Sequence, residues 1–158
     1  FIAQINAYIA MVWTYPMQII AGVMDAAVDC KFPLESEGEL SDGKIKVVSP
    51  DISKSSSAQT DIINIAFRLT AMLCLGLDNT PLYLDEAGVR MDEKHRDRFN
   101  GLIEQLMERK QVSQVFMISH YAAMHGVFTN ADITVIDKSN IINIPREYNQ
   151  NAVINYID

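Results

Sequence analysis

The chain has 158 residues, of which 49% are hydrophobic, enough for one compact domain with a single core. Its formal net charge of −7 argues against a surface that attracts DNA broadly, because DNA binding relies on Lys and Arg contacts to phosphates. No apolar run approaches the length that spans a membrane, and the start at Phe1 carries no basic stretch, so neither membrane insertion nor export is supported.

A helix is the first predicted element. Its apolar residues fall at helical spacing and form one stripe, which comprises Phe1, Ile2, Ile5, Tyr8, Ile9, Val12 and Trp13. We expect the helix to end near Tyr15, because Pro16 disfavours helical backbone in the residue before it. Residues 1–15 fit the root of a coiled coil that docks onto the domain, and they fit an ordinary amphipathic core helix nearly as well.

Strands are predicted next, around an acidic turn. Residues 17–28 are ambiguous between strand and helix. Residues 30–35 and 44–48 are typical of strands, and they bracket a turn-rich acidic segment at residues 36–43.

The two cysteines favour a reducing compartment. Cys30 and Cys74 have no metal-like spacing, and nothing in the sequence suggests a disulfide. Cys74 lies in an apolar helical run, where a buried thiol is the expected state. We therefore expect a cytoplasmic protein.

A serine-rich segment precedes the next helix. Ser55, Ser56 and Ser57 stand just before an apolar-periodic run at residues 61–73, where hydroxyl side chains ordinarily cap the first helical turn. Such a helix start is also an anion site, because its free amides and its dipole direct positive charge at whatever lies in front of it. Within the helix, Arg68 must find a partner or reach solvent, because it interrupts an otherwise apolar face.

A short apolar strand then ends in two carboxylates. Residues 81–84 are mostly apolar, and Asp85 and Glu86 follow at the strand tip. This is the chemistry of a Walker B site: Asp85 would help to hold Mg²⁺ through a water, and Glu86 would orient and deprotonate the water that attacks a γ-phosphate. On these residues alone, a strand that simply meets solvent is an equally good interpretation.

The rest of the chain alternates between helix and strand. A helix at residues 92–110 is predicted to be capped by Asp92, and its buried face is expected to comprise Leu102, Ile103, Leu106 and Met107. Its basic residues alternate with acidic ones, which is typical of a solvated face: Arg90, Lys94, His95, Arg96 and Arg98. A strand at residues 114–119 leads into His120, a short helix follows, and further strands are predicted at 133–136 and 141–144. This order favours a parallel α/β sheet with the motifs at the carboxyl ends of strands.

Together these segments resemble the C-terminal lobe of an ABC-type ATPase head, specifically that of SMC-like DNA-repair ATPases of the SbcC type. The motifs extend from about Ser55 to Asp137. Residues 55–59 stand where that family has its Leu-Ser-Gly-Gly-Gln/Glu signature, residues 85–86 match Walker B, residues 89–92 match the D-loop, and residues 119–120 match the H-loop. Residues 66–69 (Ala-Phe-Arg-Leu) also resemble this branch more than a transporter ATPase.

The chain departs from the family in two respects. Ser57 and Ala58 replace both signature glycines, and Ala87-Gly88 replaces the usual Pro-Thr after Walker B. No Gly-x-x-x-x-Gly-Lys-Ser/Thr motif is present, and in the resembled family that Walker A loop comes from an N-terminal lobe beyond a long coiled coil. The resemblance therefore implies that residues 1–158 are the C-terminal lobe alone.

The resemblance implies a site and a set of partners. ATP and Mg²⁺ would be the cofactors, with Glu86 as the general base and His120 as the γ-phosphate sensor. Arg68 would be a switch that changes acidic partners with nucleotide state. The nucleotide and dimer interface would involve Ser56, Ser57, Gln59 and Asp92. The partners would be the N-terminal lobe of the same ATPase, a second head in a homodimer, an SbcD-type nuclease and DNA, in the cytoplasm and with no membrane involved.

Three other functions fit parts of the same pattern. A structural SMC-type protein that entraps DNA would share every motif. A transporter ATPase would need a membrane partner and a more faithful glycine-rich signature. A non-hydrolysing interaction module would fit the degenerate signature but not the intact Asp85-Glu86 pair.

Overall fold

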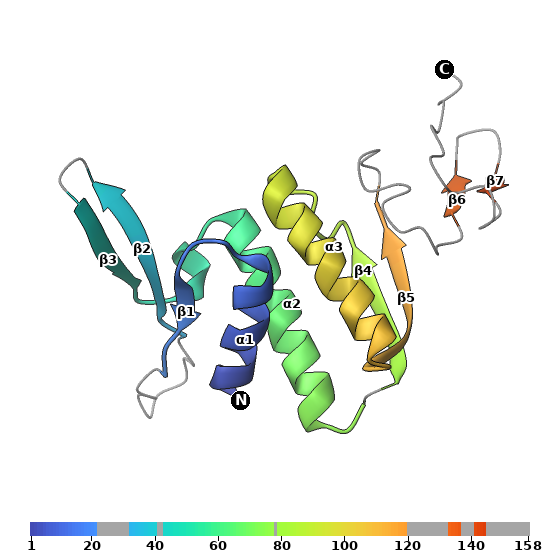
Figure 1. Cartoon of the computed structure of the whole chain (residues 1–158), viewed down its shortest axis with the longest axis horizontal. Coiled ribbons are helices and arrows are strands. Elements are labelled where there is room, and N and C mark those ends of the chain that lie inside the picture. The colour runs from blue at the N-terminus through green and yellow to red at the C-terminus, as the bar shows by residue number, and fades with distance from the viewer. Residues whose placement is uncertain (22–31, 41–42, 78, 120–132, 137–140, 145–158) are drawn as a thin grey trace, which may run out of the picture.

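The computed structural model describes residues 1–21, 32–40, 43–77, 79–119, 133–136 and 141–144. Its elements in chain order are α1 (Ile2–Val12), β1 (Met17–Ile19), β2 (Leu34–Leu40), β3 (Gly43–Ser49), the 3₁₀ helix η1 (Ile52–Lys54), α2 (Ser57–Cys74), β4 (Thr80–Asp85), α3 (Glu93–Glu108), β5 (Val112–Ile118), β6 (Ile133–Ile136) and β7 (Ile141–Ile144), as Figure 1 shows. The expectations for residues 22–31, which include Cys30, and for His120 and the helix after it lie outside these residues.

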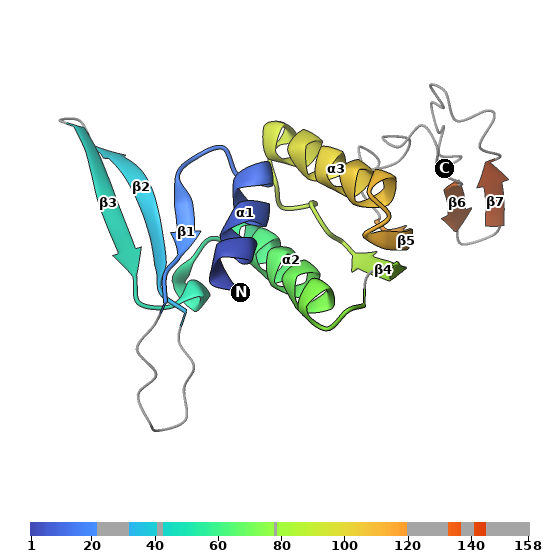
Figure 2. The same cartoon turned by 60° about the horizontal axis from the view of Figure 1, so that its bottom comes forward.

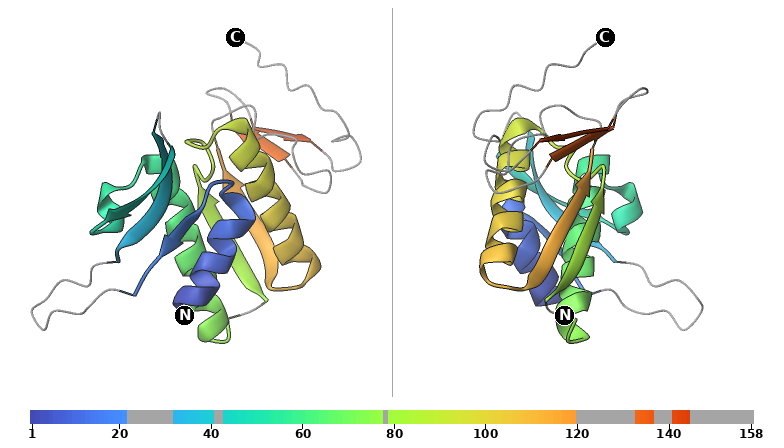
Figure 3. Two further views of the ribbon diagram at one scale, coloured as in Figure 1. Left: turned by 60° about the vertical axis from the view of Figure 1, so that its left-hand side comes forward. Right: turned by 90° about the vertical axis from the view of Figure 1, so that its right-hand side faces the viewer.

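Within the described residues, the three α-helices form a central layer with a sheet on either side. The antiparallel β1–β2–β3 sheet lies beside α1, whereas the parallel β4–β5 pair lies beside α3 (Figures 2 and 3). The parallel sheet predicted from the alternation of strands and helices is therefore confirmed.

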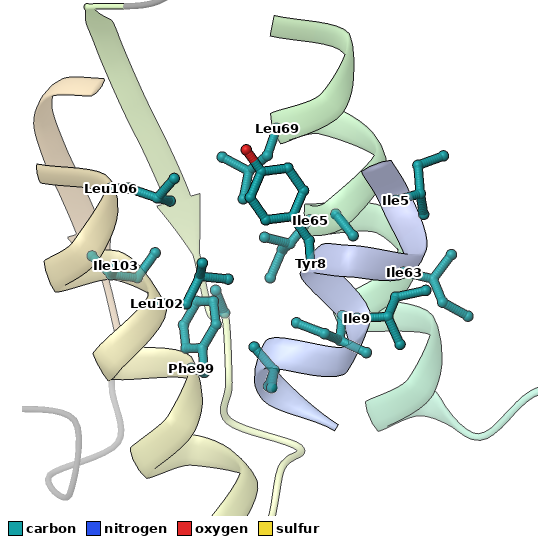
Figure 4. Packing of buried hydrophobic residues seen from close by; sticks show 14 of the residues in the cluster. Ile5, Tyr8, Ile9, Ile63, Ile65, Leu69, Phe99, Leu102, Ile103 and Leu106 are labelled. Carbon is teal, nitrogen blue, oxygen red and sulfur yellow. The ribbon is translucent and has the colours of Figure 1, made fainter. Parts of the chain in front are cut away.

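One hydrophobic core joins the helices to β4 (Figure 4). Side chains from α3 point toward the apolar faces of α1 and α2, and the Tyr8 ring lies among them. Labelled members of this core are Ile5, Tyr8, Ile9, Ile63, Ile65, Leu69, Phe99, Leu102, Ile103 and Leu106. Burying an aliphatic or phenyl side chain of this size contributes roughly 1.5–3 kcal/mol, so this layer holds the site loops in place.

The N-terminal helix ends three residues earlier than predicted. Ile5, Tyr8, Ile9 and Val12 are buried, as the apolar stripe predicts, but α1 ends at Val12 and not near Tyr15. Trp13 already has extended backbone, and its N–H donates to the Ile9 carbonyl at 2.7 Å. The helix therefore ends before Tyr15, the residue whose backbone Pro16 restricts.

The acidic turn predicted at residues 36–43 is mostly strand. Ser36–Leu40 belong to β2 and pair in antiparallel register with β3. Glu35 forms an ion pair with Lys46 at 3.1 Å, and Glu37 forms one with Lys44 at 3.6 Å. These cross-strand ion pairs stabilise acidic residues within a strand. The hydrogen bond from Lys46 lowers the pKa of Glu35.

The two longer helices largely follow their sequence signals. α2 ends at Cys74, and Gly76 follows its C-cap with a left-handed φ of +65°, which lets the next amide, that of Leu77, bond back to the Met72 carbonyl. Cys74, expected to be buried, is exposed because the last turn of α2 extends beyond the core.

α3 begins after the predicted cap, Asp92, and buries Leu102, Ile103 and Leu106. The expectation for Met107 is wrong, because it turns to the outer side of the helix and is 40% exposed. β6 and β7 match the two strands predicted near the end and pair antiparallel. Within the described part of the chain, no helix combines the length and the apolar character needed to cross a membrane.

Candidate functional site

The acidic pair lies at the carboxyl end of the parallel sheet. Asp85 is the last residue of β4, and the Glu86 N–H donates to the carbonyl of Ile118 at the end of β5, at 2.9 Å. Glu86 has a left-handed φ of +52°, which costs a non-glycine residue roughly 1–2 kcal/mol. That conformation turns the chain away from β4 and sets the direction of the loop at residues 86–92, hereafter the β4–α3 loop.

A cleft of about 340 Å³ lies between the β4–α3 loop and α2. Arg68, Asp85 and Glu86 all line it, so the structure brings together three of the residues singled out from the sequence. The other residues that line the cleft are Asp61, Asn64, Ile65, Leu84, Ala87, Val89 and Arg90. Carboxylates and guanidinium groups thus meet in one concave site, as a polyanion held through a metal ion would require.

The arginines of the cleft make one hydrogen bond and one ion pair. Arg68 Nη2 donates to the Tyr83 carbonyl of β4 at 2.9 Å, and Arg90 Nη1 lies 3.6 Å from Asp61 Oδ1. Arg68 is exposed, and its guanidinium group bonds to a main-chain oxygen. The switch between acidic partners stays a prediction.

The acidic pair fits a magnesium ion carried by a nucleotide. Asp85 is exposed at the strand tip, and the described residues contain no group of three or more His, Cys, Asp or Glu side chains that could hold a metal by themselves. Mg²⁺ keeps several waters and takes one or two carboxylates together with substrate phosphates. A single exposed aspartate therefore suits Mg²⁺ bound chiefly by phosphates and water.

The signature segment forms a capping box at the start of α2. Ser56 Oγ accepts from the Gln59 N–H at 3.3 Å, while the Gln59 Oε1 accepts from the Ser56 N–H at 2.9 Å. Ser57 is the exposed first residue of the helix. None of Ser56, Ser57 and Gln59 is among the described residues that line the cleft, so the structure separates them from Asp85 and Glu86.

Asp92 caps α3 and also holds a histidine. Asp92 Oδ1 accepts from the His95 backbone N–H at 2.9 Å, and its Oδ2 lies 2.7 Å from His95 Nδ1. The alternating charges predict a solvated face for His95, but the residue is only 2% exposed. A histidine three residues after an aspartate N-cap was the available signal, because both reach the same side of the first turn.

Titration of Asp92 should be visible in the stability of the fold. The hydrogen bond from the His95 backbone N–H lowers the pKa of Asp92. Its contribution is then complete above the ordinary aspartate pKa of about 3.9 and is lost as the pH falls through the lower folded value. In urea denaturation between about pH 5 and pH 2, we expect the Asp92→Asn variant, which keeps an acceptor for the cap, to lose less stability than the wild type. Parallel curves for the two proteins would contradict this.

The predicted sensor loop is only partly described. Ser119 follows β5 and is half-buried. The end of this strand lies beside Glu86, because the Glu86 N–H donates to the Ile118 carbonyl. His120 lies outside the described residues, so its assignment as a γ-phosphate sensor stays a prediction.

The parallel strands and the flanking helices define an α/β fold. No protein-family model matches the chain, and no curated protein matches it in sequence. It is similar to a solved structure described as "Structural biochemistry of ATP-driven dimerization and DNA stimulated activation of SMC ATPases", with a TM-score of 0.58 and 10% identity over 93% of this chain and 87% of that chain. At this identity the likeness establishes a common fold.

Proposed function

We propose that this chain is the C-terminal half of an ATP-binding and ATP-hydrolysing head, of the kind found in SbcC-like DNA-repair ATPases. One observation carries the proposal: Asp85 and Glu86 lie at the carboxyl end of a parallel strand and line a cleft together with Arg68, within a fold similar to an SMC ATPase head. Ligands of open α/β sheets bind at this end of the strands.

Each residue of the site has a proposed role. Bound Mg²⁺ would neutralise charge on the phosphates of ATP, and Asp85 would hold that ion through a water. Glu86 would accept the proton of the attacking water, and His120 would contact the γ-phosphate. Ser56, at the N-terminus of α2, would donate to the nucleotide of a second head.

The outer face of the β4–β5 sheet supports the need for a second lobe. Tyr83 and Phe116 stack there with ring centroids 4.8 Å apart and an interplanar angle of 8°. The side chains of Tyr83, Phe116 and Ile118 are 59%, 40% and 64% exposed. Parallel sheets are normally covered on both faces, so an apolar partner on this face fits the chain better than water does. The proposed N-terminal lobe, with its Walker A loop, would be that partner.

The chain alone should bind Mg-ATP no more tightly than millimolar, because its sequence has no phosphate-cradling loop. Isothermal titration of Mg-ATP into the 158-residue chain measures this directly. Adding the N-terminal lobe should restore binding and phosphate release. Micromolar affinity for the chain alone would contradict the proposed division of the site.

The proposal extends to assembly. ATP would hold two heads together in a homodimer, and hydrolysis would release them and control an SbcD-type nuclease on DNA ends in the cytoplasm. Because the net charge is −7, most of the positive charge that contacts DNA would come from partners. Loss of ATP-dependent nuclease stimulation, with ATPase activity retained, would favour a structural SMC-type protein instead.

A non-hydrolysing interaction module is a second candidate. The capping box favours it, because the side chains of Ser56 and Gln59 already accept hydrogen bonds from backbone N–H groups at the start of α2 without nucleotide. Phosphate release by the reconstituted head decides between the two: its absence, despite ATP-dependent dimerisation, would select the interaction module.

A further inference from the structure

A buried histidine joins two distant parts of the chain. His95, in the first turn of α3, lies between Asp92 and the segment that follows α1. Its Nε2 is 3.1 Å from Thr14 Oγ1, and its ring stacks on Trp13 with centroids 4.2 Å apart and an interplanar angle of 23°. A carboxylate can only accept, so His95 Nδ1 donates to Asp92, and in the neutral ring Nε2 accepts from the Thr14 hydroxyl.

An arginine one turn further along fastens the same two helices. Arg98 Nε donates to the Met11 carbonyl at 2.9 Å, and Arg98 Nη2 donates to the Ala10 carbonyl at 3.1 Å. These carbonyls belong to the last turn of α1, where helical partners are lacking and the helix dipole favours a cation. We call Trp13, Thr14, Asp92, His95 and Arg98 the α1–α3 latch.

The latch meets the β4–α3 loop at Asp92. That loop is short and anchored along its length: Ala87 and Met91 are buried, and the Met91 N–H donates to the Gly88 carbonyl at 3.1 Å. Its other end is fixed where the Glu86 N–H bonds to Ile118. A displacement of α3 at Asp92 cannot be absorbed by slack in the loop, so it reaches Glu86.

We propose that His95 is a positioning residue, and that the α1–α3 latch transmits the position of the end of α1 to the carboxylates of Asp92 and Glu86. The catalytic meaning of this coupling rests on the proposed ATPase function, whereas the coupling itself does not. Both carboxylate oxygens of Asp92 contact His95, so the orientation of the Asp92 side chain depends on the position of the imidazole ring. Thr14 and Trp13 hold that imidazole from the α1 side.

Amide hydrogen exchange of the 158-residue chain tests the coupling. Thr14→Val removes one hydroxyl far along the chain from the loop. Losing about one neutral hydrogen bond should raise exchange at Glu86, Val89 and Met91 roughly fivefold. His95→Gln should raise it at least as much. Trp13 is the only tryptophan in the sequence, so its emission reports the stack and should shift to longer wavelength in His95→Gln.

A matched control separates coupling from general loss of stability. Asn6 joins α1 to β1 through two hydrogen bonds with Ile19, at 2.9 and 2.8 Å, and takes no part in the latch. Asn6→Ala should raise exchange in β1 and leave the β4–α3 loop unchanged. Thr14→Ser, which keeps the hydroxyl, should restore wild-type exchange in the loop.

The outcomes distinguish the latch from the ATPase proposal. In a head reconstituted with the N-terminal lobe, Thr14→Val should lower kcat and leave KM unchanged, because Thr14 contacts His95 and is not among the described residues that line the cleft. Faster loop exchange without any ATPase activity in the wild type would sustain the latch and reject the ATPase function. Unchanged loop exchange in both Thr14→Val and His95→Gln would overturn the latch, whatever the ATPase activity.

Discussion

Replacement of Glu86 by glutamine should slow ATP hydrolysis by the reconstituted head about 10²- to 10⁴-fold, the usual cost of losing a positioned general base. The amide keeps the size of the side chain, and glutamine tolerates the left-handed backbone at this position no worse than glutamate. Nucleotide binding should therefore survive, and the ATP-bound dimer should persist. Phosphate release measures the first effect, and size-exclusion chromatography with ATP measures the second.

Glu93→Gln is a matched control for this experiment. Glu93 is exposed and lies next to the loop, in the first turn of α3. Its substitution removes the same charge from a residue that does not line the cleft. We expect turnover close to that of the wild type. If Glu86→Gln hydrolyses ATP at the wild-type rate, the base lies elsewhere and Asp85-Glu86 is only the polar end of a strand.

Replacement of Ser56 by aspartate should weaken ATP-driven dimerisation about 10- to 150-fold, because a hydrogen bond to phosphate worth roughly 1.5–3 kcal/mol is lost. Aspartate is as good an N-cap as serine, so α2 should keep its start while a negative charge faces the phosphates of the second head. This design separates the two possible roles of Ser56. Light scattering with ATP follows dimerisation, and a fluorescent ATP analogue follows binding within each head.

Two further variants identify the origin of any effect. Ser56→Ala removes the cap and should lower the free energy of unfolding by about 1 kcal/mol, whatever its effect on nucleotide. Ser53→Asp places the same charge three residues earlier, on the exposed face of η1, and should leave dimerisation intact. Undiminished dimerisation of Ser56→Asp would leave residues 55–59 as a helix cap and nothing more.

The elements near the site could be predicted because their signals are local. The serines before α2, the aspartate before α3 and the apolar run of β4 each act within one turn or one strand. The strands at 133–136 and 141–144 were also located correctly, because β-branched residues dominate both. The place of Asp85 at the carboxyl end of a parallel strand also followed from the order of the motifs along an α/β sheet.

Long-range partners could not be predicted in the same way. His95 and Arg98 lie on a helix whose charges alternate in sign. Contact with α1 and the segment after it, more than eighty residues earlier in the chain, buries His95 and lets Arg98 bond to the last carbonyls of α1. Residues 36–40 had a turn-like composition, but pairing with the lysines of β3 made them a strand. In each case tertiary contacts overrode a correct local preference.

The unpaired edge of β5 affects how the protein is best produced. β5, Val112–Ile118, contains no charged residue, proline or glycine, and within the described residues it pairs with β4 alone. A bare, uncharged edge of this kind adds strands from other copies as readily as from its proper partner, which is the first step of aggregation. We therefore expect the chain to aggregate when it is produced alone and to stay in solution when it is produced together with the proposed N-terminal lobe.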